Sequence, residues 1–386
     1  MTKTSDRSWR PAQFVVPFLG AVAGFLLSAL LLILLGKSVP DAFGALWDGS
    51  LGSAFARGNT LNKGAALTFA ALSFVICFRA RLISVGQEGQ LFIGALASTA
   101  AVLALDGVLT PWLAITLALA AGALGGAAWG ALAGVLKVTF GVNETISTLL
   151  LNFVAVFLVG YTVQVEFLLR QEITATATEP QSRAIPDSLR LPLLDDGSGS
   201  QAHLGVILAV AATIVVAFVL KYTVFGLRIR QLGGNPTMAA RSGASPDALT
   251  IKVLAFSGAI AGLAGPSLVL GEQFRLRSDI SDGIGFNGIA AALMGSGAAI
   301  GSLISAMFLG ALRAGGNLME IRADVNAFVV LVIQGVVIIF VAAGSAAMRG
   351  EAKPIVERLV DAYRDIRRPP APKLTVEPQD AAEEAT

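Results

Sequence analysis

Uncharged, mainly apolar runs alternate with short polar stretches along the whole chain. The runs cover residues 14–36, 64–78, 89–105, 107–136, 145–165, 204–220, 253–271, 283–312 and 325–348. Most of them reach or approach the roughly 20 apolar residues that a helix needs to cross about 30 Å of hydrocarbon. Because backbone groups in lipid must pair within their own segment, and because barrel-like alternation is absent, the pattern predicts membrane-spanning helices.

Composition agrees with this prediction. Hydrophobic residues make up 55% of the 386 residues, charged residues make up 14%, and the mean hydropathy is +0.73. The expected fold class is therefore all-α, a polytopic transmembrane bundle of about 8–10 helices. The net charge of only +2 gives no reason to expect a nucleic-acid polymer as a partner. Cys77, the single cysteine, lies in an apolar run and is interpreted as a packing residue.

The positions of lysine and arginine in the loops predict the orientation. With residues 1–12 in the cytoplasm, the loops on that side carry many of the basic residues: Arg79, Arg81, Lys137 and the segment 221–252. The opposite side then holds the loop 166–202, in which acidic residues outnumber basic ones. We therefore expect 221–252 to be a cytoplasmic segment and 166–202 to be an external loop.

The expected side of the C-terminal tail requires an even number of membrane crossings. The tail 349–386 begins with basic residues, so it is expected in the cytoplasm, and its Pro-, Ala- and acid-rich end is typical of disorder. If each of the nine apolar runs crossed the membrane once, a chain that begins in the cytoplasm would end on the opposite side. The best candidate for a glycine-broken or re-entrant run is 283–312, which is too short for two spans and contains Gly295, Gly297 and Gly301.

A second broken segment is expected at 82–105, where Gly86 and Gly89 bracket two polar residues. Paired broken segments in two halves are typical of inverted-repeat transporters, with the substrate path at their junction. The transmembrane domain is therefore expected to cover 13–348, with halves at 13–165 and 203–348.

Four glycines recur every four residues: Gly122, Gly126, Gly130 and Gly134. They form one stripe on a helix face, which favours close helix packing in lipid. His203, the only histidine, has no cysteine or second histidine to share a metal, so no metal site is expected. No nucleophile with its base is found either, and the chain is predicted not to be an enzyme.

Several polar residues lie at the starts of apolar runs. Glu88 begins one, and a carboxylate at membrane depth is a functional candidate unless it is interfacial and paired with Arg79 or Arg81. The sequence leaves both interpretations open. A second polar cluster spans 143–152, and a third is Phe286 with Asn287 beside the broken segment.

The segment 221–252 contains a predicted helix of about two turns, which Asn235 and Pro236 can start and Gly243 can stop. It would lie outside the membrane between two spans. On sequence pattern alone it could be any amphipathic loop helix.

Three ordered motifs resemble one family. Residues 226–243 read G-L-R-I-R-Q-L-G-G-N-P-T-M-A-A-R-S-G, residues 141–152 read G-V-N-E-T-I-S-T-L-L-L-N, and residues 85–90 read V-G-Q-E-G-Q before I-G-A at 93–95. These motifs are similar to those of ABC-importer permeases that serve branched-chain amino acids, ribose-type sugars and nucleosides, most closely the nucleoside-type members. The resemblance covers about 64–344. It departs at Ser84, Thr145 and Gln231, of which Ser84 bears on substrate identity.

The resemblance implies partners and a mechanism. Two permease subunits, expected to be a heterodimer, would form the path, and a lipoprotein or periplasmic binding protein would deliver substrate. A cytoplasmic ATPase, expected to be a tandem one, would bind ATP and Mg, so this chain itself is expected to hold no cofactor. The implied ATPase-coupling residues are Arg228, Arg230, Gly233, Asn235, Pro236, Ala239, Ala240 and Gly243. The chain would lie in the bacterial cytoplasmic (inner) membrane with both termini in the cytoplasm.

A small neutral substrate is expected, because the membrane segments hold few charges. Asparagine and glutamine amides could bind ribose hydroxyls or a base edge, and an aromatic ring could stack on a base. The candidate substrate-binding residues are Gln87, Glu88, Gln90, Asn143, Glu144, Asn152, Phe286 and Asn287.

Two other functions compete with nucleoside import. A ribose-type simple-sugar importer would share the same motifs. An ion-driven secondary transporter is disfavoured by the lack of a convincing mid-membrane coupling carboxylate. A purely structural scaffold would not explain three motifs in order.

Overall fold

A computed structural model describes residues 12–172, 179–195, 197, 199–241, 243 and 245–348. This part of the chain is helical, and it contains isolated β-bridges but no β-strand. Seven of its helices are long and apolar enough to cross a membrane, which confirms the predicted polytopic helical bundle. Residues 1–11 of the expected N-terminal segment and the whole tail 349–386 lie outside the described residues.

The helices of the first half are α1 (Ala12–Leu34), α2 (Val39–Ser50), α3 (Ala54–Arg79), α4 (Gln87–Ala104), α5 (Pro111–Phe140) and α6 (Glu144–Gln164). The connection to the second half contains a short 3₁₀ turn, η1 (Asp187–Leu189). The second half consists of α7 (Gly205–Tyr222), α8 (Val224–Gly234), α9 (Pro236–Arg241), α10 (Pro246–Gly262), α11 (Ala264–Leu268), the π-helix η2 (Val269–Gln273), α12 (Ile284–Met294), α13 (Ala299–Ala323) and α14 (Ala327–Met348).

Helix α3 begins well before the apolar run 64–78. Ser53 caps its start by accepting a hydrogen bond from the backbone N–H of Ala56 at 3.0 Å. The polar residues of its first turns have partners elsewhere in the bundle. Asn62 donates to the Gln201 carbonyl at 2.6 Å, and Lys63 forms an ion pair with Glu272 of η2 at 3.1 Å. These partners explain why the helix extends through residues that interrupt the hydropathy pattern.

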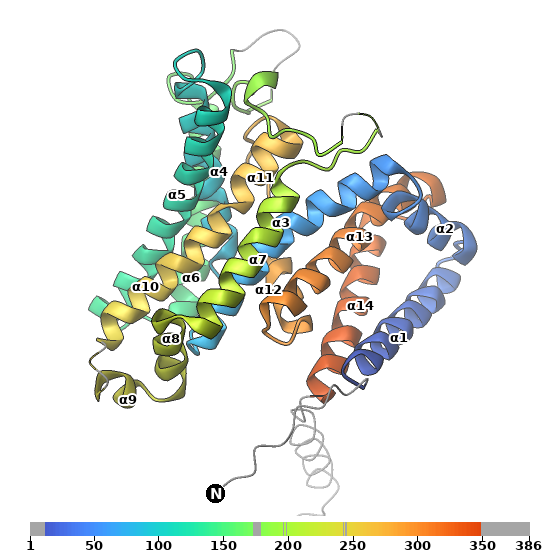
Figure 1. The fold of residues 1–386 in the computed structure, drawn as a ribbon. Helices are drawn as coiled ribbons and strands as arrows, with labels where there is room; N and C mark the ends of the chain where they lie inside the picture. The colour runs from blue at the N-terminus through green and yellow to red at the C-terminus, as the bar shows by residue number, and fades with distance from the viewer. Residues whose placement is uncertain are drawn as a thin grey trace, which may run out of the picture.

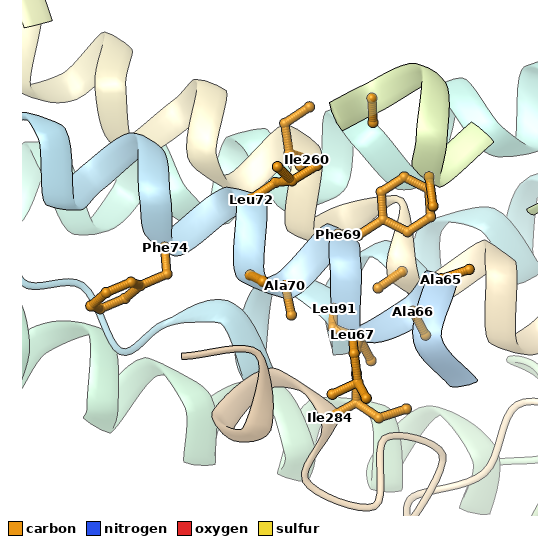
Figure 2. Close-up of a cluster of buried hydrophobic side chains, with 14 of the residues drawn as sticks. Ala65, Ala66, Leu67, Phe69, Ala70, Leu72, Phe74, Leu91, Ile260 and Ile284 are labelled. Carbon is orange, nitrogen blue, oxygen red and sulfur yellow. The ribbon is translucent and has the colours of Figure 1, made fainter. Parts of the chain in front are cut away.

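Helix α3 forms the centre of the bundle, and most of its side chains are buried. Other helices surround it on several sides (Figure 1). Figure 2 shows Leu67 of α3 close to Leu91 of α4 and Ile284 of α12, the two helices that begin at the broken segments. The apolar core therefore positions the starts of α4 and α12 directly against α3.

The two halves pack through matching contacts. A methyl group added to Gly126 of α5 would overlap the Gly258 carbonyl and lie 2.7 Å from Cα of Gly262 on α10. A methyl group added to Gly310 of α13 would lie 2.8 Å from both the Thr60 carbonyl and Cα of Gly64 on α3. The packing of α5 against α10 thus repeats the packing of α13 against α3. Helices α3 and α10 themselves run in opposite directions (Figure 1). This is the arrangement of an inverted repeat.

The predicted break in 283–312 separates two helices. Helix α12 ends at Met294, and a turn with Ser296 and Gly297 in the left-handed region leads into α13. Helix α13 then continues to Ala323 as a full-length span, so the run is broken and does not fold back as a short re-entrant hairpin. The sequence pattern ended this run at Arg313, a charged residue that the helix accommodates through an ion pair with Asp282.

The described chain begins and ends at one end of the bundle. The start of α1 and the end of α14 lie at the same end as α8 and α9 (Figure 1). The described residues of the connection 165–204 lie at the opposite end, where backbone hydrogen bonds tie them to the second half (Figure 1). Ser182 donates to the Leu276 carbonyl at 2.9 Å, and Ile185 donates to the Phe274 carbonyl at 3.0 Å.

Candidate functional site

The N-termini of α4 and α12 meet inside the bundle. Glu88, in the first turn of α4, is buried, and its Oε2 accepts a hydrogen bond from the backbone N–H of Gly285 at 2.7 Å. The Ser281 hydroxyl and the Phe286 N–H also interact favourably with this carboxylate. Glu88 therefore satisfies backbone donors at the start of α12, where a negative charge also complements the helix dipole. Its partners lie at the start of α12, and it is buried rather than paired with Arg79 or Arg81 in the described part of the chain.

The irregular segment before α4 is held by a row of polar side chains on α6. Thr145 donates to the Ile83 carbonyl at 2.8 Å, and the Thr148 hydroxyl accepts from the Val85 N–H at 3.1 Å. Asn152 uses both ends of its amide, donating to the Val85 carbonyl and accepting from the Gly89 N–H, each at 2.8 Å. Non-helical backbone in a membrane protein needs such partners.

Asn143 and Glu144 of the same cluster lie at the N-terminal end of α6. Asn143 is exposed and caps the helix by accepting from the Thr145 N–H at 2.9 Å. Glu144 forms an ion pair with Lys137 at 2.6 Å and accepts from the Ile83 N–H at 3.4 Å. The cluster therefore forms one structural strip along 83–89.

Two glutamines of α4 face the interior. Gln90 accepts from the Ser73 hydroxyl at 3.3 Å, and Ser73 lies 2.8 Å from the hydroxyl of Ser257, so α3, α4 and α10 share one polar cluster. Gln87 donates to the Ser84 carbonyl at 3.2 Å. Its Oε1 is buried and has no hydrogen-bond partner among the described residues. This oxygen is free to accept a hydrogen bond.

Phe286 and Asn287 lie on a more open side of α12. Phe286 is exposed and Asn287 is half-buried, whereas Ile284 and Gly285 are buried. Just before the helix, Asp282 forms an ion pair with Arg313 of α13 at 2.5 Å. Sequence reasoning missed both members of this pair. A lone arginine inside what is a regular 25-residue helix was the signal that could have indicated them.

The four glycines of the α5 stripe pack against α10 and α11. Added methyl groups would contact Pro266 at Gly122 and Ile251 at Gly134, at 2.9 Å in each case. At Gly126 and Gly130 they would overlap carbonyl oxygens of α10. The two backbones are therefore as close as small-residue stripes permit.

The segment 221–252 contains two short helices between α7 and α10, namely α8 and α9, and sequence reasoning predicted only α9. Asn235 caps α9 by accepting from the Thr237 N–H at 2.9 Å, and Gly243 has a φ of +79° beyond its end. In α8, Arg228 is exposed, while Arg230 donates to the Leu220 carbonyl of α7 at 2.6 Å. On α9, Ala239 is buried and Ala240 is exposed.

Gly233 joins α8 to the end of α3. A methyl group added there would lie 3.0 Å from the Ala80 carbonyl carbon and would overlap the Arg79 carbonyl oxygen. The Arg79 guanidinium in turn donates twice to the Gly297 carbonyl, at 2.8 and 3.1 Å, in the turn between α12 and α13. Contacts therefore run without interruption from α8 through α3 to α12.

The amino-acid sequence was compared with those of known proteins and protein families. Residues 57–342 match the family described as branched-chain amino acid transport system / permease component. The chain belongs to this family. The match extends from α3 into α14, so it includes both halves of the inverted repeat and the segment 221–252. The chain is a multi-pass membrane protein, and its relatives are permease components of transport systems rather than enzymes.

Individual permeases are similar over most of their length. The guanosine ABC transporter permease protein NupP of Bacillus subtilis is 31% identical over 87% of this chain and 95% of its own length. The guanosine ABC transporter permease protein NupQ of the same organism is 29% identical over 69% of this chain and 84% of its own length. The glucose ABC transporter permease protein TsgB13 of Haloferax volcanii is 31% identical over 84% of this chain and 86% of its own. No solved structure matches the chain.

Proposed function

We propose that the chain is a membrane-spanning permease subunit of an ATP-driven ABC importer for nucleosides. The observation that carries this proposal is the similarity to guanosine permeases across both halves of the bundle. The geometry fits a transporter, because two broken helices meet by their N-termini in the interior. Transporters with inverted repeats bind substrate at such junctions and alternate access around them.

Neutral hydrogen-bonding groups support a nucleoside as the substrate. Gln87 keeps a free buried acceptor, Asn287 is partly accessible, and the exposed Phe286 ring can stack on a base. Gln90, Asn152 and Glu88 already bond to their own chain, so we assign them the task of holding the two helix starts in place. Substrate contact by these three residues would require those bonds to change during transport.

The segment 221–252 is proposed to dock on the ATPase. Arg228 and Ala240 are exposed on α8 and α9, while Gly233 links the segment to α3 inside the bundle. ATP and Mg would be bound by that partner. The permease would lie in the bacterial cytoplasmic membrane with both termini and this segment in the cytoplasm, and the opposite end would receive substrate from a binding lipoprotein or periplasmic protein.

A second permease subunit completes the proposed path. NupP and NupQ are both guanosine permeases of one organism, and both match this chain, which supports a pair of related but different subunits. A heterodimer of this kind would place two inverted-repeat bundles side by side.

Import of a simple sugar is the second candidate. The specific observation in its favour is the similarity to the glucose permease TsgB13, which is as identical to this chain as NupP is. Ribose-type substrates share hydroxyl groups with nucleosides but offer no base for Phe286 to stack on.

Uptake by the complete transporter in proteoliposomes tests the function. We expect ATP-dependent accumulation of radiolabelled guanosine that requires the binding protein. If glucose or ribose is imported and guanosine is not, the substrate class is simple sugars and the nucleoside proposal is wrong. Guanosine uptake that persists without ATP and follows an ion gradient would overturn the ABC assignment.

A matched pair of variants tests the coupling segment. Ala240→Glu adds a charge to the exposed face of α9 and should abolish uptake and co-purification of the ATPase. Val142→Glu adds the same charge to the exposed loop between α5 and α6 and should leave both unchanged. Gly233 is unsuitable for this test, because any side chain there would collide with α3. Normal uptake by Ala240→Glu would contradict the docking assignment.

A further inference from the structure

The ion pair between Asp282 and Arg313 lies at an unusual depth. Arg313 is near the middle of α13, a 25-residue helix that is long and apolar enough to span the membrane. Its guanidinium also binds the Asp282 backbone carbonyl, and its side chain is only 11% exposed. The partner carboxylate must therefore lie at a similar depth.

The Asp282 side chain is nevertheless 88% exposed in the isolated chain. A charge at the centre of a span is costly when it faces lipid, and such residues face the bundle interior or a water-filled cavity instead. The exposed Phe286 and the half-buried Asn287 follow one turn later on α12. Asp282, Phe286 and Asn287 therefore form a strip with two polar members, and exposing this strip to lipid would be unfavourable.

One polar atom of the pair is unused. Arg313 Nη1 is buried and has no hydrogen-bond partner among the described residues, although Nη2 is fully occupied by Asp282. A buried guanidinium N–H without an acceptor is costly unless water or a ligand supplies one. The accessible part of the site thus offers a carboxylate acceptor, an amide and an aromatic ring, while the buried Arg313 holds the carboxylate.

Resting on the nucleoside-importer function proposed above, we propose that Asp282, Phe286 and Asn287 form the substrate-contact site of this chain, on the water-filled path that it shares with the second permease, and that the buried Arg313 positions Asp282. The ligand class is an uncharged riboside. Asp282 accepts from adjacent ribose hydroxyls, the Asn287 amide bonds to the base edge, and Phe286 stacks on the base. Because Asp282 neutralises Arg313 and is itself accessible, a phosphorylated nucleoside is repelled.

Cysteine accessibility tests this site directly. The chain has a single cysteine, Cys77, which is fully buried, so a Cys77→Ala chain gives a clean background. Asn287→Cys and Asp282→Cys are introduced separately into it, and Ile214→Cys provides the lipid-facing control on α7, where Ile214 is 64% exposed. The complete complex in proteoliposomes is treated with a charged, water-soluble methanethiosulfonate during ATP turnover, with and without guanosine.

We expect the Asn287→Cys and Asp282→Cys chains to react at least about tenfold faster than Ile214→Cys, since the reagent needs water, and guanosine to slow the reaction. Asn287→Cys preserves the ion pair, so it remains informative if Asp282→Cys does not assemble. Reaction no faster than the control in a complex that still imports guanosine would overturn the site and leave the proposed function standing. Failure of the Cys77→Ala complex and the unmodified complex to import guanosine would instead overturn the function.

Kinetics supply a second measurement. Asp282→Asn removes the charge while keeping an acceptor oxygen, and the loss of a charged hydrogen bond predicts a KM for guanosine that is raised by about tenfold or more. An unchanged KM in a normally assembled complex would contradict the proposed role of Asp282.

Discussion

Glu88 on α4 accepts a hydrogen bond from the Gly285 N–H on α12 at 2.7 Å, and the two residues occupy equivalent positions in the two halves. Glu88 follows Ser84 and Gly86 at the same intervals at which Gly285 follows Ser281 and Gly283. The side chain of one repeat therefore caps the helix of the other at the centre of the bundle. Since glycine at 285 has no side chain to return the contact, the junction is asymmetric.

Replacing Glu88 by alanine removes the acceptor and leaves buried N–H groups of α12 unpaired. We expect Glu88→Ala to lower the free energy of unfolding by about 1–3 kcal/mol, and Glu88→Gln to lose less because it keeps an acceptor oxygen. Thermal unfolding in detergent measures both. A stability unchanged in Glu88→Ala, together with a raised KM for substrate, would show that the carboxylate serves substrate and not the helix.

The tight contact between α5 and α10 predicts a position-specific effect of a larger side chain. Gly126→Leu forces the two helices apart and should destabilise the bundle by at least about 1–3 kcal/mol, as overpacking generally does. Gly160→Leu is the matched control, because no atom beyond its own helix lies within 4 Å of a methyl group added to Gly160 of α6. Equal melting temperatures for the two variants would rule out the close approach.

The features that sequence reasoning recovered are those that are local in the chain. The glycine stripe needs only helical spacing, and the break at Gly295 and Gly297 needs only glycines that interrupt an apolar run. The caps at Asn235 and Gly243 belong to the same class, because a few neighbouring residues determine them.

The features that it missed depend on which helices become neighbours. Asn152 looked like a candidate substrate contact because nothing in the sequence pairs it with Val85 and Gly89, the backbone groups it binds. The same reason explains why Arg313 ended an apolar run in the sequence although it lies inside α13. A charge that finds a tertiary partner does not end a helix, and a hydropathy pattern cannot reveal that partner.

Arg79 is predicted to carry the movement of the coupling segment to α12. It lies at the end of α3 against Gly233 of α8, and it donates to the Gly297 carbonyl at 2.8 and 3.1 Å. We expect Arg79→Gln to reduce guanosine uptake by about tenfold or more, the effect of losing hydrogen bonds from a charged donor. ATP hydrolysis by the assembled complex should continue, so the ratio of substrate imported to ATP hydrolysed falls.

Arg81→Gln is the control for this prediction, because it removes the same charge from an exposed position two residues away. Uptake should be nearly normal in that variant. If both variants lose uptake to the same extent, local charge explains the loss and the contact with Gly297 does not. If Arg79→Gln imports normally, the relay through α3 is wrong.

His203 predicts how stability changes with pH. It precedes α7 and is buried; its Nδ1 accepts from the Gly205 N–H at 3.1 Å, and an added methyl group at Gly271 would touch the ring. Burial lowers the pKa of His203 from 6.5 to about 4. Between these two pH values the unfolded chain binds more protons than the folded one, so stability is complete above pH 6.5 and falls as the pH is lowered towards 4.

At pH 5 the expected loss is on the order of 2 kcal/mol relative to pH 7.5, which follows from the two pKa values. Thermal unfolding in detergent across this range measures the loss, and His203→Gln is the comparison, because glutamine is polar but does not titrate. The variant should be less stable at pH 7.5 yet show a flatter dependence on pH. An equal slope in both proteins would assign the acid sensitivity to other groups, since only the slope, and not the stability at one pH, reports on the proton that His203 gains on unfolding.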